Sequence, residues 1–255
     1  MIEIDEQLGT VTVVGSDGSR RSLPMDSAEA FEMASKAWLR CGWDVKHVYS
    51  FTWMGRPIIQ LPEDIVRLQE VIYAVKPDLL VETGVAHGGS LVFYASLFAG
   101  MGKGRVVGVD IEIRTHNRTA IEAHPLSRLI TLIEGSSIDP VTVAQVRAQR
   151  RAEDRVMVIL DSNHSREHVL AELEAYAPMV SVGSYVVACD GIMRDLQGAP
   201  RSRPDWGRNN PAQAARDFVA RHPEFAIAAP SFGFNEGTVE KPVTYWPDGY
   251  ICRLR

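Results

Sequence analysis

The stretch Val81-Glu-Thr-Gly-Val-Ala-His-Gly-Gly-Ser90 decides the fold expected for this chain. The apolar run before it, Leu79–Val81, is typical of a buried strand, and the run Ser90–Phe98 after it is typical of a helix. Glycines between a strand and a helix let the backbone come close to a ligand. The pattern therefore predicts the first unit of an open α/β sheet with a cofactor cleft, although glycines at such turns also serve packing alone.

The acid at the end of this strand, Glu82, indicates which cofactor the cleft binds. A dinucleotide-binding turn reads Gly-x-Gly-x-x-Gly and leaves bare backbone amides for a pyrophosphate, whereas this loop reads Glu-x-Gly-x-x-x-Gly. A carboxylate here repels phosphates and attracts the amino group of S-adenosylmethionine. We therefore expect S-adenosylmethionine rather than NAD, with cofactor contacts from Glu82, Gly84, His87, Gly88 and Ser90, and from Asp161 later in the chain.

Composition favours a globular protein that acts on small molecules. Apolar residues make up 45% of the 255 residues, and a net charge of -5 with scattered basic residues gives no reason to expect nucleic acid or membrane as a partner. No apolar run approaches the roughly 20 residues of a membrane helix, and the N-terminus is acidic where a signal peptide is basic. We expect a cytoplasmic protein with three free thiols, at Cys41, Cys189 and Cys252.

Apolar strands alternate with helical patterns through most of the chain. Strands are expected at 79–83, 105–110, 129–134, 156–161 and 183–189, and helices at about 88–100, 116–124, 139–151, 165–177 and 211–221. This alternation requires parallel pairing with right-handed crossovers. We predict a doubly wound, Rossmann-like α/β sheet of the class I methyltransferase type, with 225–229 and 249–254 as an antiparallel pair at its edge.

An N-terminal extension, residues 1–62, precedes the main domain, which is expected to cover residues 63–255. Alternating apolar residues in 2–14 predict a short hairpin, and Ser27 is expected to cap a helix that ends near Cys41, before Gly42. An aromatic segment follows at 43–53; it either faces the substrate or packs under the sheet. The hairpin and this segment suggest self-association, so we expect a homo-oligomer.

Acids end all five predicted strands, and ligands of such sheets bind beyond these carboxyl ends. Asp110, at the end of the second strand, is expected to accept the ribose hydroxyls of the cofactor, unless it is only a turn residue. Ser136 and Ser137, after the third strand, are candidates for contact with the adenine edge, or for the start of a helix cap.

The segment Asp161-Ser-Asn-His164 is the second informative feature. If the fourth and fifth strands are neighbours, Asp161 lies beside Asp190, and two such carboxylates repel each other unless a cation lies between them. Oxygen ligands select Mg²⁺ or a similar hard cation. A substrate hydroxyl on that ion would be deprotonated by His164 and receive the methyl group. Alternatively, the two acids cap loops independently and His164 only begins a helix.

These features together resemble the cephalosporin hydroxylase-like and rhamnosyl O-methyltransferase family, relatives of the macrolide-sugar methyltransferases. The resemblance covers roughly residues 45–195 and is carried by four segments, Tyr49–Asp64, Val81–Ser90, Leu160–Val169 and Gly183–Val187. It implies a class I methyltransferase fold, S-adenosylmethionine as donor, and Mg²⁺-assisted transfer to a hydroxyl, often on a deoxysugar of a natural product or glycolipid. It also implies His164 as the base.

The resemblance implies a metal held by Asp161 and by a Glu-Asp pair that closes the next strand. This chain departs there, because the pair reads Cys189-Asp190. A thiol is a soft, poor ligand for Mg²⁺, so water or another group such as Asn163 fills the place, or the metal is weak or absent. Three alternatives to a sugar O-methyltransferase stay open: a non-sugar acceptor such as a β-lactam precursor or phenol, an NAD-binding dehydrogenase, and a non-catalytic partner protein.

Overall fold

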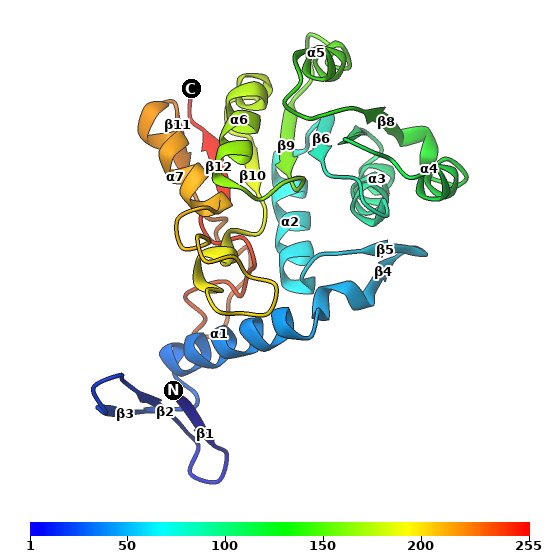
Figure 1. Cartoon of the computed structure of the whole chain (residues 1–255). Coiled ribbons are helices and arrows are strands. Elements are labelled where there is room, and N and C mark those ends of the chain that lie inside the picture. The colour runs from blue at the N-terminus through cyan, green and yellow to red at the C-terminus, as the bar shows by residue number, and fades with distance from the viewer.

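A seven-stranded sheet forms the centre of the computed structural model, which describes residues 1–255 (Figure 1). The strand order is β11-β12-β10-β9-β6-β7-β8, and β12 runs antiparallel to both of its neighbours while the other pairs are parallel. The predicted doubly wound sheet and its antiparallel edge pair are confirmed. The strands are β6 (Leu79–Thr83), β7 (Arg105–Asp110), β8 (Ile130–Glu134), β9 (Val156–Leu160), β10 (Tyr185–Ala188), β11 (Phe225–Ile227) and β12 (Tyr250–Arg253).

Helices cover both faces of this sheet and enclose two apolar cores. Alternate residues of one strand enter different cores: Leu80 faces the cluster with α2 and α3, whereas Leu79 and Val81 face the cluster with α5, α6 and α7. We find no helix with the length and apolar character of a membrane span. The helices are α2 (Pro62–Val75), α3 (Gly89–Met101), α4 (Thr115–Glu122), α5 (Pro140–Ala148), α6 (Arg166–Tyr176) and α7 (Pro211–Arg221), and α3 to α7 each lie within a few residues of their predictions.

The N-terminal segment differs from its prediction in two ways. The expected hairpin is a three-stranded antiparallel sheet of β1 (Ile2–Asp5), β2 (Thr10–Val14) and β3 (Arg20–Pro24). Its third strand buries only Leu23, so it has no apolar alternation to reveal it. Ser27 caps α1 (Ala28–Asp44) as predicted, but the helix continues past Gly42. A Cβ at Gly42 would lie 3.1 Å from the Tyr245 hydroxyl, so this glycine serves close packing rather than helix termination.

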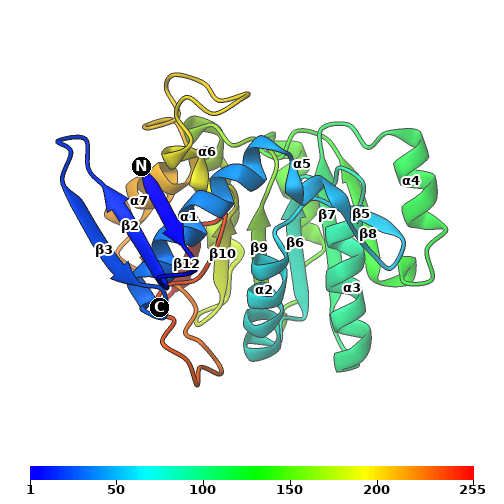
Figure 2. The same ribbon diagram turned by 90° about the horizontal axis from the view of Figure 1, so that it is seen from below.

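Only the first part of the extension stands apart from the main sheet. Figures 1 and 2 place β1–β3 at one end of the molecule, with a small core of its own made by Val11, Leu23 and Ala30. Beyond this point the chain joins the larger core through Leu39, Val48, Ile58 and Leu61. The hairpin of β4 (Phe51–Trp53) and β5 (Arg56–Ile58) lies against α3. The boundary at residue 62 stays a prediction.

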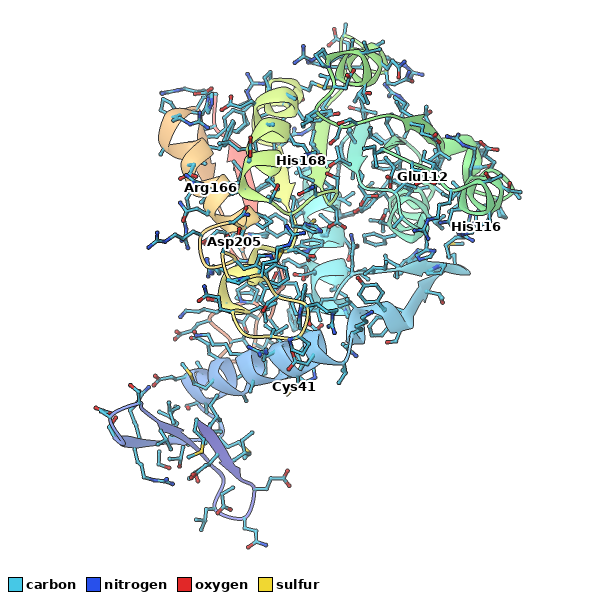
Figure 3. The ribbon with its side chains drawn as sticks, in the orientation of Figure 1. Cys41, Glu112, His116, Arg166, His168 and Asp205 are labelled. Carbon is cyan, nitrogen blue, oxygen red and sulfur yellow. The ribbon has the colours of Figure 1, made fainter.

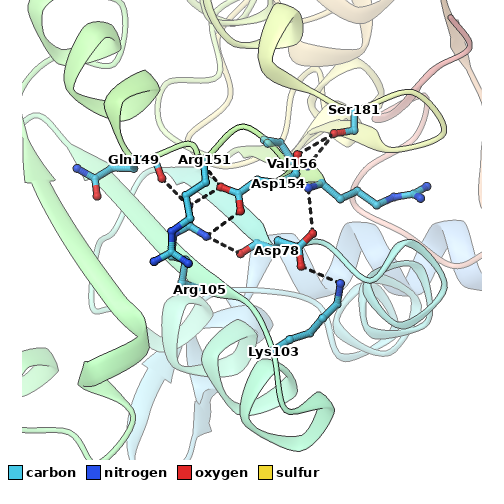
Figure 4. A network of polar contacts seen from close by, with 9 residues as sticks. Asp78, Lys103, Arg105, Gln149, Arg151, Asp154, Val156 and Ser181 are labelled. Atoms are coloured by element: carbon cyan, nitrogen blue, oxygen red, sulfur yellow. Dashed lines mark hydrogen bonds and ion pairs between the residues drawn. The ribbon is translucent and has the colours of Figure 1, made fainter.

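A network of charged groups joins the amino ends of the central strands (Figure 4). The Arg105 guanidinium on β7 contacts both carboxylate oxygens of Asp154, one of them at 3.1 Å, and this contact lowers the pKa of Asp154. Asp78 accepts hydrogen bonds from the Arg155 backbone N–H at 3.0 Å and from Lys103 Nζ at 2.8 Å. The ends of β6, β7 and β9 are therefore held together opposite the rim where ligands bind.

Replacement of Asp154 by Ala is expected to lower the free energy of unfolding by about 3 kcal/mol, because it leaves the mostly buried Arg105 charge without its partner. The pKa of Asp154 is lower in the folded chain than in the unfolded chain. The carboxylate therefore stabilises the fold above the pKa of the unfolded chain, and this stabilisation is lost as the pH falls through the pKa of the folded chain. Urea unfolding at pH 7 measures the change. The control Lys103→Ala, in an exposed pair, should cost less than about 1 kcal/mol, and equal losses would contradict this account.

Candidate active site

The glycine loop after β6 is packed between two other segments. Gly84 has a φ of +95°, and a Cβ there would lie 2.1 Å from the backbone oxygen of Asp161 at the end of β9. A Cβ on Gly89 would lie 2.1 Å from the backbone oxygen of Pro57 on β5. Larger residues do not fit at either position, so the glycines bring the loop, the end of β9 and the N-terminal extension to one place.

Two side chains from outside the loop fix its conformation. Arg56 on β5 donates through Nε and Nη2 to the backbone oxygen of His87, at 3.0 and 2.6 Å, and Nη2 also reaches Asn117 Oδ1 at 3.1 Å. Asn117 on α4 donates to the backbone oxygen of Ala86 at 2.9 Å. Ala86 has a φ of +45°, an unfavourable conformation that needs such support. Sequence reasoning missed both residues, because nothing in their spacing reveals the direction of their side chains.

Glu82 lies beneath the loop rather than in open solvent. Its side chain is fully buried and accepts hydrogen bonds from the Ser90 hydroxyl at 2.6 Å and the Tyr94 hydroxyl at 2.8 Å. Burial raises the pKa of Glu82 to about 8, against the effect of these two bonds. Its carboxyl is therefore mostly protonated at neutral pH in this structure. The expected pairing with the amino group of a cofactor stays a prediction and requires Glu82 to ionise when the ligand binds.

Asp110, the residue expected to bind ribose, also supports the loop. Its Oδ2 accepts the backbone N–H groups of Val85 and Ala86 at 2.8 and 3.1 Å, and its Oδ1 accepts that of Glu112 at 3.3 Å. The Oδ1 bond is the longest of the three, so this oxygen is the better placed to accept a ligand hydroxyl. Asp110 is thus both a candidate cofactor contact and a structural part of the loop.

The two serines expected near the adenine differ in their surroundings. Ser137 is buried, and its hydroxyl lies 3.1 Å from Nε2 of His168, which Figure 3 labels on α6. Its backbone oxygen accepts the Tyr176 hydroxyl at 2.7 Å. Ser136 is half-buried, and its backbone oxygen accepts the N–H of Asp139, which caps α5. The side chain of Ser137 is therefore engaged with α6, and an adenine contact remains a prediction for both residues.

Asp161, His164 and Asp190 come together at the carboxyl ends of β9 and β10. The two strands are parallel neighbours, and ligand atoms of the three residues lie within 4.8 Å of one another. Burial and the charge of Asp190 raise the pKa of Asp161, and burial raises that of Asp190 although His164 opposes it. Nε2 of His164 lies 3.6 Å from Oδ2 of Asp190. Asp190 has a φ of +59°, a left-handed conformation that is uncommon for residues other than glycine, asparagine and aspartate.

The thiol of Cys189 is not one of these three gathered groups. It is fully buried in the apolar core on the α2 and α3 side, where burial raises its pKa and keeps it protonated. Asn163 is exposed, and its Oδ1 accepts the backbone N–H of Ser165 at 2.9 Å. Gln60 is a better source of a further oxygen, because it lines the same cavity as the two acids and its buried Oε1 has no hydrogen-bond partner.

Two adjoining cavities share this group of side chains. One, of about 160 Å³, is lined by the glycine loop together with Asp161, His164 and Asp190. The other, of about 70 Å³, shares Tyr49, Ile59, Gln60 and Asp190 with the first. Its remaining walls are mostly aromatic or cationic, namely Trp43, Lys46, Val48, Leu61, Arg201, Tyr245 and Trp246. A reacting group of a second substrate in this cavity would meet Asp190.

The second cavity joins two segments that are far apart in the sequence. Trp43, at the end of α1, donates through Nε1 to the backbone oxygen of Pro200 at 3.4 Å, and Arg201 donates to the backbone oxygen of Trp43 at 2.6 Å. Trp53, in contrast, bonds the Ser96 hydroxyl at 3.1 Å and packs on α3. Trp53 therefore packs in the interior, while a substrate-facing role for Trp43 and Tyr49, which line the cavity, stays a prediction.

Residues 45–254 match the sequence model of the family described as "Rhamnosyl O-methyltransferase/CmcI". The chain belongs to this family. Rhamnosyl O-methyltransferase of Mycobacterium tuberculosis is 31% identical over 153 residues, which are 58% of this chain and 59% of that protein. The Mycobacterium leprae protein of the same name is 29% identical over 192 residues, or 72% of this chain and 81% of that one. About two fifths of the Mycobacterium tuberculosis protein therefore lies outside its match with this chain.

Solved structures show that the fold is shared with O-methyltransferases. A structure of CmcI with Mg and SAM covers 81% of this chain and 78% of its own, with a TM-score of 0.53 and 18% identity. A putative caffeoyl-CoA O-methyltransferase from Staphylococcus aureus covers 75% and 85%, with a TM-score of 0.54 and 16% identity. The class I methyltransferase fold and the family expected from the sequence are confirmed.

The buried carboxyl of Glu82 makes a prediction about stability and pH. Its pKa of about 8 in the folded chain lies above its ordinary value of 4.5, so the folded state holds the proton more tightly. The wild type should therefore lose at least about 1 kcal/mol of stability through Glu82 as the pH rises from 5 to 8. Glu82→Gln should remove that part of the slope in urea unfolding, whereas the exposed control Glu112→Gln should not. Equal slopes in all three proteins would show that Glu82 is ionised throughout.

Proposed function

We propose that this chain is an S-adenosylmethionine-dependent O-methyltransferase that methylates a sugar hydroxyl with the help of a divalent cation. The observation that carries the proposal is the meeting of Asp161, His164 and Asp190 beside the glycine loop, in a chain of the rhamnosyl O-methyltransferase/CmcI family. The cavity of the loop would hold the methyl donor, and the adjoining cavity would hold the acceptor. Asp190 lines both cavities, so the donor and acceptor would meet there.

The side chains at this point suit Mg²⁺. The carboxylates of Asp161 and Asp190 lie close together and both have raised pKa values, so a cation between them would stabilise their ionised forms. The Oε1 atom of Gln60, which has no hydrogen-bond partner, offers another oxygen ligand. Hard oxygen donors of this kind select Mg²⁺ over softer metals. Asp161 and Asp190 would hold the ion, and Cys189 would not. A bound Mg²⁺ makes a coordinated hydroxyl more acidic.

His164 is suited to take the proton of the acceptor hydroxyl. Its Nε2 faces the Asp190 carboxylate, which orients the imidazole and stabilises the imidazolium formed when the proton arrives. The glycine loop, fixed by Arg56 and Asp110, would hold the donor so that its methyl group lies in line with the hydroxyl oxygen. The chain's contribution is thus position and proton removal, while the sulfonium supplies the methyl group.

A sugar acceptor is favoured by the walls of the smaller cavity and by the names of the relatives. Trp43, Tyr49 and Trp246 offer aromatic faces, and Gln60, Lys46 and Arg201 offer polar groups for hydroxyls. The mycobacterial relatives are named rhamnosyl O-methyltransferases. A non-sugar acceptor, such as a phenol or a β-lactam precursor, is the alternative; a coupled assay of methyl transfer to nucleotide sugars and to phenols separates the two.

Cofactor choice is tested by isothermal titration with S-adenosylmethionine and with NAD. We expect saturable binding of S-adenosylmethionine and none of NAD, because a carboxyl lies under the loop where a dinucleotide site leaves bare amides for phosphate. A protein that binds NAD and not S-adenosylmethionine would be a nucleotide-binding protein on the same sheet, and the proposal would fail.

Replacement of His164 by Ala should lower the rate of methyl transfer at least roughly a hundredfold, the usual scale for loss of a general base. Affinity for S-adenosylmethionine should be kept, since His164 is not part of the glycine loop. The matched control is His116→Ala, an exposed histidine on α4 that Figure 3 labels at one edge of the molecule and that does not line the cavity of His164. Unchanged turnover of the His164 variant would remove this residue from the mechanism.

A further inference from the structure

The smaller cavity, which we propose for the acceptor, has a closed floor and an open rim. Its floor contains four residues that are each at most 4% exposed, namely Gln60, Leu61, Tyr245 and Trp246. Three exposed residues form the rim, namely Lys46, Tyr49 and Arg201. The volume of about 70 Å³ is below the range of about 300–1,000 Å³ that is usual for a whole small-molecule site. Most of an acceptor molecule would therefore lie over the rim.

Lys46 and Arg201 place two positive charges on this rim, and neither forms an ion pair with a carboxylate of the chain. Nζ of Lys46 lies 5.5 Å from the centre of the Tyr49 ring. Nη2 of Arg201 donates to the backbone oxygen of Trp43 at 2.6 Å, and this is the one hydrogen bond of its side chain. Both charged groups are thus free to bind a ligand.

The acids near the rim have other partners. Asp190 is the only acid that lines the cavity, and its Oδ2 faces Nε2 of His164 at 3.6 Å. Asp44, two residues before Lys46, contacts Nε of Arg40 at 3.2 Å. The rim therefore carries a positive charge that no carboxylate of the chain neutralises.

The backbone holds both cations in a left-handed conformation, with φ of 58° at Lys46 and 65° at Arg201. Such values are uncommon for residues with long side chains. The chain has seven non-glycine residues of this kind, and three of them, Lys46, Asp190 and Arg201, are among the eleven residues that line this cavity. Unfavourable backbone conformations gather at ligand sites, so their concentration here supports a binding role for both cations.

We propose that the acceptor is a phosphorylated sugar, whose phosphate is bound by Lys46 and Arg201 at the rim while its reacting hydroxyl enters the cavity toward Asp190. A neutral sugar would displace water from two cations without replacing its hydrogen bonds, which is unfavourable. A phosphate carries up to two negative charges and accepts hydrogen bonds from ammonium and guanidinium groups alike. The inference rests on the proposed sugar O-methyltransferase function and narrows its acceptor to sugar phosphates, nucleotide sugars included.

Isothermal titration of the full chain tests this inference with four probes: glucose 1-phosphate, UDP-glucose, glucuronic acid and methyl glucoside. EDTA is present, so that a phosphate does not bind through a metal ion, and each titration is made with and without S-adenosylhomocysteine. At least one phosphorylated probe should bind about tenfold or more tightly than methyl glucoside, the scale of one hydrogen bond to a charged group. The carboxylate of glucuronic acid should give a smaller gain. Comparison of the two phosphorylated probes shows which source of the phosphate the rim prefers.

Lys46→Met and Arg201→Met each remove one charge and keep an unbranched side chain. Each should weaken the phosphorylated probes about tenfold and leave methyl glucoside unchanged, a difference that lost packing alone would not produce. The matched control is Lys76→Met, which should leave all probes unchanged. Lys76 has a φ of 52° and its Nζ lies 5.5 Å from the centre of the Tyr73 ring, but it lines neither cavity.

Two results would overturn this inference and leave the proposed function standing. The first is that neither phosphorylated probe binds more tightly than methyl glucoside. The second is that Lys46→Met and Arg201→Met lose affinity for S-adenosylmethionine, which would assign the two cations to the carboxylate of the donor. Failure of the proposed function gives a different result, in which the chain prefers phosphorylated sugars but does not bind S-adenosylmethionine.

Discussion

The repulsion between Asp161 and Asp190 is the constraint on which this site depends. Parallel pairing of β9 with β10 puts the two carboxyl groups side by side, with ligand atoms within 4.8 Å. Two negative charges at that separation near a protein surface repel by roughly 3 to 4 kcal/mol. Burial together with this repulsion raises the pKa of Asp161, and burial raises that of Asp190. A divalent cation between the two carboxylates would relieve this repulsion, which is why we propose a metal at this place.

The remainder of the site is arranged around this pair by segments from the whole chain. Arg56 from the extension and Asp110 from β7 hold the glycine loop against the end of β9, so the cavity that we propose for the methyl donor opens beside the acids. The end of α1 and the stretch after β10 meet at Trp43 and close the acceptor side. The N-terminal extension thus packs into the larger core from about Leu39 onward, and only β1–β3 stands apart with a small core of its own.

Much of the fold could be predicted from the sequence, because the apolar residues of buried strands and amphipathic helices recur at clear spacings. Parallel pairing then brings the acids at the strand ends to the same edge of the sheet. The third N-terminal strand could not, since it buries a single residue. At the candidate site, the meeting of Asp161, His164 and Asp190 could be predicted from their positions at the ends of neighbouring strands. The protonated state of Glu82, the engagement of Ser137 with His168 and the part played by Arg56 depend on side-chain directions and burial, which a sequence without a fold does not contain.

The most direct test of this account is the location of a metal ion in crystals grown with Mn²⁺ and S-adenosylhomocysteine. Anomalous scattering should show one strong peak at coordination distance from both Asp161 and Asp190. The sulfur of the cofactor should lie beside this peak, and Cys189 should not coordinate the ion. A site with ordered cofactor and no peak between the two carboxylates, at Mn²⁺ concentrations that saturate ordinary carboxylate sites, would contradict the account.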